Sequence, residues 1–394
     1  MYIERMNDYS TNIKDILDLI DKDSLFISSW DKEPLILNFS EQIIEKSINN
    51  TEHKNTYIMS KGMDKTKQLI ENYFIQNNIR ITKDNFTIVS NGTSAGFISF
   101  LQVYKHNCKN VLFIGPVYFT YYQLMKIFQQ ECFYMSLDLF KKIHIDIDLL
   151  KKELLFNNIQ CIIIPIPFFG AGIDMDTKFL KELSIFCEAN EIYILIDYIY
   201  GNMEWNTKNH MYNSELINLA ISLKYCILYE SISKRIFLNG IKSALIYGNP
   251  SMIASINIDS EICQGSISFV QESILNYIYT KPYNDITNSF IVNSLEYAQN
   301  NYNILKALLL DTEFLICNTE SGYFTLIGIP KKFFSSKDDH NIAKEIKEKC
   351  GIVTIPHSRY YYFHTNYYCF RVNLPLNTDK IIESFRTMLD FCSN

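Results

Sequence analysis

From residue 86 to about residue 248, short apolar runs alternate with helix-like segments, and this alternation constrains the fold more than any other feature. The runs Cys161–Ile166, Ile192–Asp197 and Tyr225–Tyr229 are rich in apolar and β-branched residues. Strands of this kind are buried on both faces, as in a parallel sheet whose crossover helices cover it. The sequence therefore predicts an α/β fold built on a mainly parallel sheet.

The pattern changes after about residue 250, which indicates a second, smaller domain. A long helical stretch is predicted from about Ser266 to Leu309. It is followed by four short strand-like pieces and a last helix, at Phe314–Cys317, Tyr323–Ile329, Ile352–Ile355, Tyr368–Leu374 and Lys380–Phe391. A chain of 394 residues is long enough for two domains. We expect a large domain over residues 48–285 and a small α+β domain formed by residues 1–47, with an N-terminal arm, and 286–394.

The composition is that of an ordinary globular protein, and it argues against several classes of function. Hydrophobic residues make up 47% of the chain, charged residues 20%, and the net charge is −6. We therefore expect no nucleic-acid partner, because there is no basic footprint. We expect no membrane partner either, because the longest apolar run is broken by prolines. The ten cysteines occur singly and the histidines lack ligand spacing, which predicts reduced core thiols, a cytoplasmic location and no metal site.

Two of the apolar runs lead into ionisable residues. Asp197 ends one run, and Lys234 follows the next within a polar segment that begins at Glu230. Desolvation lowers the pKa of a buried lysine, and the neutral amine is what a Schiff base requires. The carboxyl ends of neighbouring parallel strands face one crevice, so we expect both side chains there. Taken singly, Asp197 is equally well a helix cap and Lys234 a surface residue.

Three further groups stand at strand ends or inside a strand. Asn91-Gly92-Thr93-Ser94 opens a helix and forms either an anion cradle or an ordinary N-cap. Tyr118 follows a Gly-Pro turn and either stacks on a flat ligand or packs in the core. Arg371 lies within an apolar strand and needs an anion, either a ligand or a structural partner. In chain order, the whole set suits one flat, anionic, aldehyde-bearing cofactor.

This ordered set resembles the fold type I pyridoxal-phosphate enzymes, and most closely the class I/II aminotransferases, over roughly residues 35–375. The matching motifs are Tyr57…Gly62, Asn91-Gly92-Thr93-Ser94, Pro116-Val117-Tyr118, Asp197-x-x-Tyr200, Ser231-x-Ser233-Lys234, Pro356-His357-Ser358 and Phe370-Arg371-Val372-Asn373. The resemblance implies a large cofactor-binding domain with a mainly parallel seven-stranded sheet and a smaller α+β C-terminal domain. It also implies a homodimer with shared active sites.

The resemblance also implies a role for each matched residue. Lys234 would hold pyridoxal 5'-phosphate as a Schiff base and move the substrate proton. Asp197 would pair with the pyridine N–H, Tyr200 would donate to the ring oxygen and Tyr118 would cover a ring face. Arg371 would grip the substrate carboxylate. The phosphate would be held by Asn91, Gly92, Thr93, Ser231 and Lys242, with Tyr57 reaching in from the second subunit.

Three positions depart from the family pattern. Pro167 stands where the family has an asparagine that donates to the ring oxygen, which predicts a raised pKa for the Schiff base, measurable by spectroscopic titration. Lys242 replaces the usual phosphate-binding arginine, so it supplies a positive charge but not the paired N–H donors of a guanidinium. His357 replaces a glycine, and Arg359 and Tyr360–Tyr362 follow it, near the expected mouth of the pocket.

The resemblance implies a pyridoxal-phosphate-dependent aminotransferase acting on an α-amino acid. One alternative keeps the cofactor but changes the chemistry, to a decarboxylase, a cyclase or eliminase, or an oxidase of amino-acid-derived natural-product biosynthesis. Accumulation of pyridoxamine phosphate with an amino acid separates the two. A non-catalytic cofactor-binding regulator is less well supported, because the chain retains Lys234 and Arg371 and has no appended DNA-binding domain.

Overall fold

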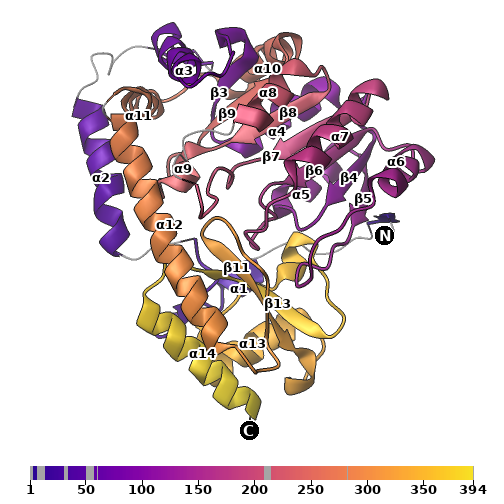
Figure 1. Ribbon diagram of the computed structural model, residues 1–394, viewed down its shortest axis with the longest axis vertical. Coiled ribbons are helices and arrows are strands. Elements are labelled where there is room, and N and C mark those ends of the chain that lie inside the picture. The colour runs from indigo at the N-terminus through magenta and orange to yellow at the C-terminus, as the bar shows by residue number, and fades with distance from the viewer. Residues whose placement is uncertain are drawn as a thin grey trace.

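The computed structural model describes residues 3–6, 14–30, 34–49, 57–59, 61–207, 214–281 and 283–393. A large sheet with helices on both sides occupies the upper part of the molecule, and a smaller group of strands and helices lies below it (Figure 1). The long helix α12 (Tyr283–Leu308) runs from one part to the other. The predicted α/β fold with a smaller α+β region is confirmed.

The large sheet has eight strands in the order β1-β5-β4-β6-β7-β8-β9-β3. The five strands from β5 to β8 are parallel, whereas β9 is antiparallel to both β8 and β3. The strands are β1 (Ile3–Arg5), β3 (Phe86–Ser90), β4 (Asn110–Ile114), β5 (Glu131–Met135), β6 (Cys161–Pro165), β7 (Tyr193–Asp197), β8 (Cys226–Glu230) and β9 (Ser243–Gly248). Seven of them form the expected sheet. The eighth, β1, was missed because its three residues, of which two are charged and exposed, carry no apolar pattern.

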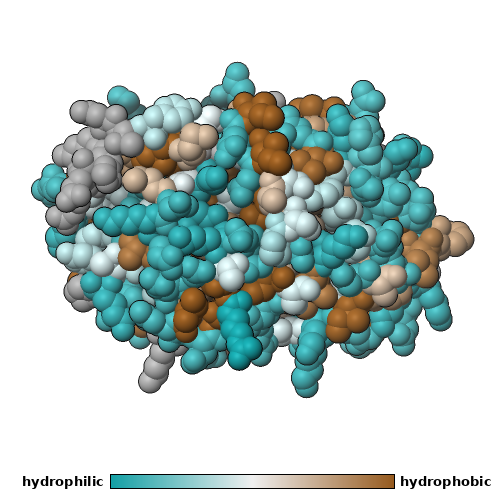
Figure 2. Space-filling view, turned by 90° about the horizontal axis from the view of Figure 1, so that it is seen from above, coloured by the Kyte–Doolittle hydropathy of each residue, from teal (hydrophilic) through white to brown (hydrophobic). Residues whose placement is uncertain are grey.

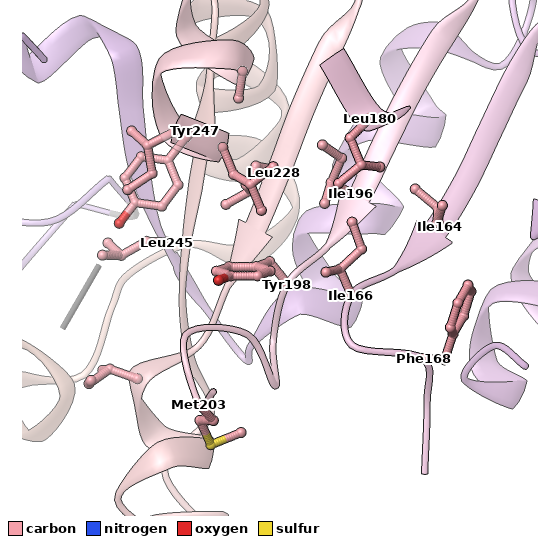
Figure 3. Close-up of a cluster of buried hydrophobic side chains, with 14 of the residues drawn as sticks. Ile164, Ile166, Phe168, Leu180, Ile196, Tyr198, Met203, Leu228, Leu245 and Tyr247 are labelled. Atoms are coloured by element: carbon pink, nitrogen blue, oxygen red, sulfur yellow. The ribbon is translucent and has the colours of Figure 1, made fainter. Parts of the chain in front are cut away.

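Alternation along each strand divides the core into two layers. Cys161 and Ile163 of β6 belong to one apolar cluster, whereas Ile162 and Ile164 belong to another on the opposite face. One face is covered by α4 (Thr93–Tyr104), α5 (Phe119–Ile127) and α10 (Pro250–Gln264), and the other by α6 (Ile147–Phe156), α7 (Thr177–Ala189) and α8 (Ser214–Ser222). Figure 3 shows the second face, where side chains from successive strands lie beside Leu180 of α7.

The smaller part is built on antiparallel strands with helices packed against them. The three-stranded sheet consists of β10 (Leu315–Ile316), β11 (Phe324–Pro330) and β13 (Tyr367–Asn373), and a parallel pair joins β12 (Ile352–Val353) to β2 (Leu25–Phe26). Its core also takes in side chains of α12, α13 (Asp339–Cys350) and α14 (Thr378–Ser393). The helical stretch predicted from Ser266 to Leu309 is divided into α11 (Phe269–Tyr279) and α12. The division follows Thr280, which is extended and stands two residues before a proline.

The remaining elements are short or N-terminal. They are α1 (Lys14–Leu17), α2 (Pro34–Asn49), α3 (Asp64–Gln76), η1 (Lys83–Asn85), α9 (Ile232–Arg235), η2 (Lys331–Phe333) and η3 (His357–Tyr360). Of the N-terminal elements, β1 pairs with β5 of the large sheet, β2 pairs with β12 of the smaller part, and α2 packs against α11. The boundaries at residues 47/48 and 285/286 stay a prediction.

The surface is largely hydrophilic where it is seen from above, and apolar residues reach it in separate patches (Figure 2). Exposed apolar side chains include Ile75 of α3 and Ile258 and Ile262 of α10. In the part of the chain that the structure describes, no helix combines the length and the apolar character needed to cross a membrane.

Candidate active site

A cavity of about 390 Å³ lies at the carboxyl ends of the parallel strands. This edge is where ligands bind in open α/β sheets, because the loops that follow neighbouring strands converge there. Most of the residues predicted from the sequence line this cavity: Asn91, Gly92, Thr93, Tyr118, Tyr200, Ser231, Lys234 and Lys242. The structure therefore brings together side chains that are more than 150 residues apart in the chain.

Lys234 lies on the short helix α9, directly after β8. Burial lowers the pKa of its ammonium group to about 8, and repulsion from Lys242 and Arg371 adds to the effect. Its Nζ donates a hydrogen bond of 3.2 Å to Oδ1 of Asn239, whose Nδ2 in turn donates to the carbonyl oxygen of Trp30 at 3.1 Å. At pH 7, roughly a tenth of Lys234 is therefore a neutral, nucleophilic amine, far more than for an ordinary lysine.

One end of the cavity is polar and is formed by the start of α4 and by the turn after β8. Asn91 and Gly92 have positive φ angles of 62° and 78°, and they lead into α4. The first N–H groups of a helix lack intrahelical acceptors, and here that of Ala95 already donates to the carbonyl oxygen of Gly92 at 3.2 Å, which leaves those of Thr93 and Ser94 to face a ligand. Ser231 donates to the carbonyl oxygen of Ser243 at 2.8 Å, so its own oxygen accepts from the hydroxyl of Ser233 at 2.7 Å. The N–H groups at the start of α4 and the ammonium group of Lys242 supply the donors and the positive charge that a phosphate requires.

Asp197 ends β7, the strand next to β8, and its carboxylate is 2% exposed. Burial raises its pKa to about 6, while a hydrogen bond from Tyr121 opposes that rise. The hydroxyl of Tyr121 donates to Oδ2 at 2.8 Å, and the backbone N–H of Ile199 approaches Oδ1 at 3.4 Å. Asp197 thus ends the strand next to the one that leads into α9 and Lys234, but unlike Lys234 it is not among the residues that line the cavity.

Arg371 is fully buried on β13 and does not itself line the cavity, but its guanidinium contacts the lining rings of Trp30 and Phe169. Its Nε and Nη2 donate to the carbonyl oxygen of Ser28 at 3.3 and 3.2 Å. Its Nη1 is buried without a hydrogen-bond partner among the described residues. A buried guanidinium with unused donors is a binding group for an anion such as a carboxylate.

Aromatic rings form the apolar end of the cavity. The ring centroid of Phe169 lies 5.9 Å from that of Tyr118 and 6.1 Å from that of Tyr200. Pro167 is not among the residues that line the cavity, and Phe169 of the same loop lines it instead. No side-chain donor enters from this loop, in agreement with the absence of an asparagine there.

His357, which replaces the family glycine, packs beneath this end as an uncharged ring. Its Nε2 lies 2.9 Å from the carbonyl oxygen of Phe169, and burial lowers its pKa to about 3. A Cβ added to Gly170 would come within 2.6 Å of Cε1 of His357. His357 therefore holds the loop of Phe169 by contact rather than by charge. Arg359 lies away from the cavity and donates to Asp15 at 2.8 Å.

Tyr57 does not line the cavity of its own chain. Its side chain is 72% exposed, next to Met59, which forms an isolated bridge with Ser266. The role that the resemblance implies for Tyr57 lies in a second subunit, and it stays a prediction.

Sequence reasoning missed four residues that the structure brings to the site: Trp30, Tyr121, Phe169 and Asn239. Tyr121 had a usable signal, because it lies one helical turn after Tyr118 and so shares its side of the helix. Asn239 precedes Gly240, a pair that predicts a turn and nothing about a ligand. Trp30 carries no local signal, since its contact with Arg371 joins the two ends of the chain.

Behind Lys234, a buried ion pair ties α9 to the end of β8. Arg235 binds Glu230, and the second carboxylate oxygen of Glu230 accepts from the hydroxyl of Tyr247 at 2.7 Å. The hydroxyl of Tyr323 donates to the backbone carbonyl of Arg235 at 2.8 Å. These contacts fix the ends of the segment that carries the lysine.

The donor set fits one kind of ligand. A phosphate suits the polar end, an aldehyde suits the amine of Lys234, and a ring with a protonated nitrogen suits the buried Asp197. Among the described residues there is no group of three or more histidine, cysteine or acidic side chains arranged to hold a metal.

Comparison with known proteins agrees with a site for a phosphate-bearing aldehyde cofactor. Residues 33–387 match the sequence model of the family "aminotransferase class I and II". Similar solved structures include YbdL of Escherichia coli, described with a methionine aminotransferase function, at 14% identity and a TM-score of 0.79, covering 97% of both chains. The aspartate aminotransferase of Thermus thermophilus with maleate is 11% identical, with a TM-score of 0.80, over 98% of this chain and 100% of that one.

A third similar structure, an aspartate aminotransferase from Rhodobacter sphaeroides, is 14% identical with a TM-score of 0.76, over 95% of this chain and 93% of that one. No curated protein matches the sequence. At these identities the solved structures establish the fold, and the family match, which covers most of the chain, establishes the class. The chain thus belongs to the aminotransferase class I and II family and is an enzyme of the pyridoxal-5'-phosphate-dependent aminotransferase type.

Proposed function

We propose that this protein transaminates an α-amino acid at the cavity beside Lys234. The observation that carries the proposal is the amine of Lys234, with its pKa near 8, held next to the strand that ends in the buried Asp197. When bound, pyridoxal 5'-phosphate supplies an aldehyde that condenses with amines and a ring that accepts electrons from Cα.

The residues of the cavity divide the binding of the cofactor among them. The start of α4, Ser231 and Lys242 would hold the phosphate, as their position at the polar end supports. Asp197 would pair with the protonated ring nitrogen, where a buried carboxylate is most effective. Tyr118 would lie against one face of the ring and Tyr200 would donate to the ring oxygen.

Two side chains would act on the substrate. Arg371 has unused donors at Nη1 and would bind the α-carboxylate, which fixes the orientation of Cα. Lys234, once its amine is free, would act as the general base that takes the Cα proton and returns it. A pKa near 8 suits this task, because the amine is neither always protonated nor too weak a base near neutral pH.

The decisive experiment is a half-reaction followed by the absorbance of the bound cofactor. Addition of an accepted amino acid, with no keto acid present, should convert the cofactor to pyridoxamine phosphate in stoichiometric amount. Lys234→Ala should abolish the conversion. Consumption of the amino acid without formation of pyridoxamine phosphate would refute transamination.

The proposal includes a homodimer in which Tyr57 serves the active site of the other subunit. Its support is the 72% exposure of Tyr57 and its absence from the cavity of its own chain. Mixed dimers of Lys234→Ala and Tyr57→Ala subunits contain one site with both residues intact. We expect such mixtures to be more active than either parent, and equal activity would exclude the sharing of sites.

We further propose a cytoplasmic location. All ten cysteines are free thiols, and most of them are buried in the core. Free core thiols are typical of proteins kept in a reducing compartment. Immunolocalisation of the tagged full chain provides the test.

A further inference from the structure

We propose that the substrate is an α-amino acid with a large apolar side chain, aromatic or long aliphatic. This inference rests on the proposed function, since it concerns the side chain of the amino acid that Arg371 and Lys234 would hold. It follows from the unequal distribution of charged and apolar groups over the two ends of the cavity.

The end of the cavity away from the phosphate site is walled by large apolar groups. They are Trp30, Tyr118, Phe119, Phe169, Ile199 and Tyr200. The rings come from different elements, and those of Tyr118 and Phe119 lie 4.5 Å apart at the start of α5. A side chain that leaves the reacting Cα on this side therefore meets ring faces and edges.

Arg371 is buried behind this apolar wall and contacts two of its rings, Trp30 and Phe169. Its guanidinium carbon lies 4.5 Å from the ring centroid of Trp30, 4.6 Å from that of Phe324 and 5.4 Å from that of Phe169. Rings over a guanidinium leave its in-plane donors available while excluding water from them. The free Nη1 can therefore bind one carboxylate, and the groups around that carboxylate are apolar.

Each positively charged side chain near the cavity already has a partner or a place in the binding of the cofactor or of the α-carboxylate. Lys234 and Lys242 lie at the polar end, Arg235 is paired with Glu230, and Arg359 is bound to Asp15. His357 is uncharged, because burial lowers its pKa to about 3. Among the described residues, none at the apolar end would neutralise a second carboxylate, and none of those lining the cavity is acidic. An acidic or basic substrate side chain would be desolvated there without a counter-charge.

The same wall distinguishes large side chains from small ones. Burial of a phenyl or isobutyl group against rings raises affinity by roughly one to two orders of magnitude over a methyl group. We therefore expect L-phenylalanine, L-leucine and L-methionine to be preferred over L-alanine, L-aspartate and L-glutamate.

The test uses the holoenzyme and the half-reaction rate for each of these six amino acids. We expect kcat/KM for the three apolar amino acids to exceed that for alanine, aspartate and glutamate by about tenfold or more. Equal or better rates with alanine, aspartate or glutamate would overturn the inference.

A binding measurement separates failure of the inference from failure of the proposed function. If no amino acid converts the cofactor, transamination fails, yet calorimetry with 3-phenylpropionate and succinate still measures the preference of the cavity. Tighter binding of 3-phenylpropionate supports an apolar site. Equal or tighter binding of succinate overturns it.

Variants test whether the apolar wall produces the preference for large apolar side chains. Phe119→Ala should lower the ratio of kcat/KM for phenylalanine over alanine by about tenfold, and Phe119→Leu should lower it less. The matched control is Phe186→Ala, at a half-buried phenylalanine on α7, outside the residues that line the cavity. Retention of the cofactor absorbance shows that each variant is folded. An unchanged ratio in Phe119→Ala would contradict the assignment of this wall to the substrate side chain.

Discussion

The hydroxyl of Tyr121 donates a 2.8 Å hydrogen bond to Oδ2 of Asp197, and both groups are buried. Burial alone raises the pKa of Asp197, whereas this hydrogen bond favours the ionised form and limits the value to about 6. Tyr121 thus helps to keep the carboxylate of Asp197 charged at a buried position, where water does not solvate it.

Tyr121→Phe should move the acid limb of the pH profile to higher pH. Loss of the hydrogen bond raises the pKa of Asp197, so a larger fraction is protonated and uncharged between about pH 6 and 7. A hydrogen bond to a charged group contributes about 1.5–3 kcal/mol, so we expect a ten- to hundredfold loss of kcat/KM at pH 6. Tyr297→Phe is the control, since that hydroxyl bonds to Leu376 far from Asp197. An acid limb that does not move would refute the role.

The charge of Lys242 should be visible in the titration of Lys234. Lys242 lowers the pKa of Lys234 by repulsion, so Lys242→Met should raise that pKa above about 8, while Lys242→Arg should leave it nearly unchanged. Uptake of pyridoxal 5'-phosphate by the cofactor-free protein requires the neutral amine. At pH 7, uptake should therefore be slower in Lys242→Met than in the wild type, and its pH midpoint should lie higher. Coincident midpoints for the two variants would contradict the prediction.

The lowered pKa of Lys234 also predicts how the stability of the cofactor-free protein depends on pH. Because the folded pKa is about 8 and the ordinary value is 10.5, the unfolded chain binds more protons between these values. The contribution of Lys234 to the free energy of unfolding therefore increases as pH rises from 8 to 10.5. Comparison of urea unfolding at pH 8 and pH 10 in the wild type and in Lys234→Met isolates this contribution. It should be absent from the variant.

The buried pair of Glu230 and Arg235 should show strong coupling. Glu230→Gln or Arg235→Met leaves an unpaired buried charge or donor, and we expect each to cost about 3–5 kcal/mol in the free energy of unfolding. The double variant removes both charges and should cost much less than the sum. Urea unfolding of all four proteins measures the coupling. Additive losses would mean that the pair does not act as a unit.

Gly170 and Gly265 provide a matched test of the contact made by His357. Both have positive φ, 73° and 70°, so the backbone strains an alanine at either position. A Cβ at Gly170 would lie 2.6 Å from His357, whereas nothing lies within 4 Å at Gly265. Gly170→Ala should therefore destabilise by about 1–3 kcal/mol more than Gly265→Ala. Adding His357→Ala should reduce the difference, and a difference that persists would place the clash elsewhere.

The sequence predicted site residues where a functional side chain lies at the end of a recognisable strand pattern. Asp197, Lys234 and the turn at Asn91 each end a strand-like run, so the order of the strands was enough to predict one crevice. The order of the strands does not point to Tyr121, whose one signal among the 27 tyrosines is its helical spacing from Tyr118. The contact between Trp30 and Arg371 depends on how the N-terminal segment crosses β13, which no local pattern encodes.

From the sequence, the boundaries of helices and strands were harder to predict than whether a segment is a helix or a strand. The predicted helical region after Ser266 is two helices, since the tertiary direction changes at Thr280 although the apolar spacing continues. The lack of a side-chain donor at Pro167 follows directly from the sequence, because proline carries none. That Phe169 would line the cavity depends on packing against His357, which the sequence did not reveal.

The three-residue strand β1 has a consequence for solubility. Its residues pair with Phe133, Tyr134 and Met135 along the outer side of β5, and Arg5 forms an ion pair with Glu131 there. An uncovered strand at this margin would present a row of unpaired backbone groups to any extended peptide. Removal of residues 1–6 is therefore expected to make chains associate edge to edge through β5, although the catalytic groups themselves remain intact.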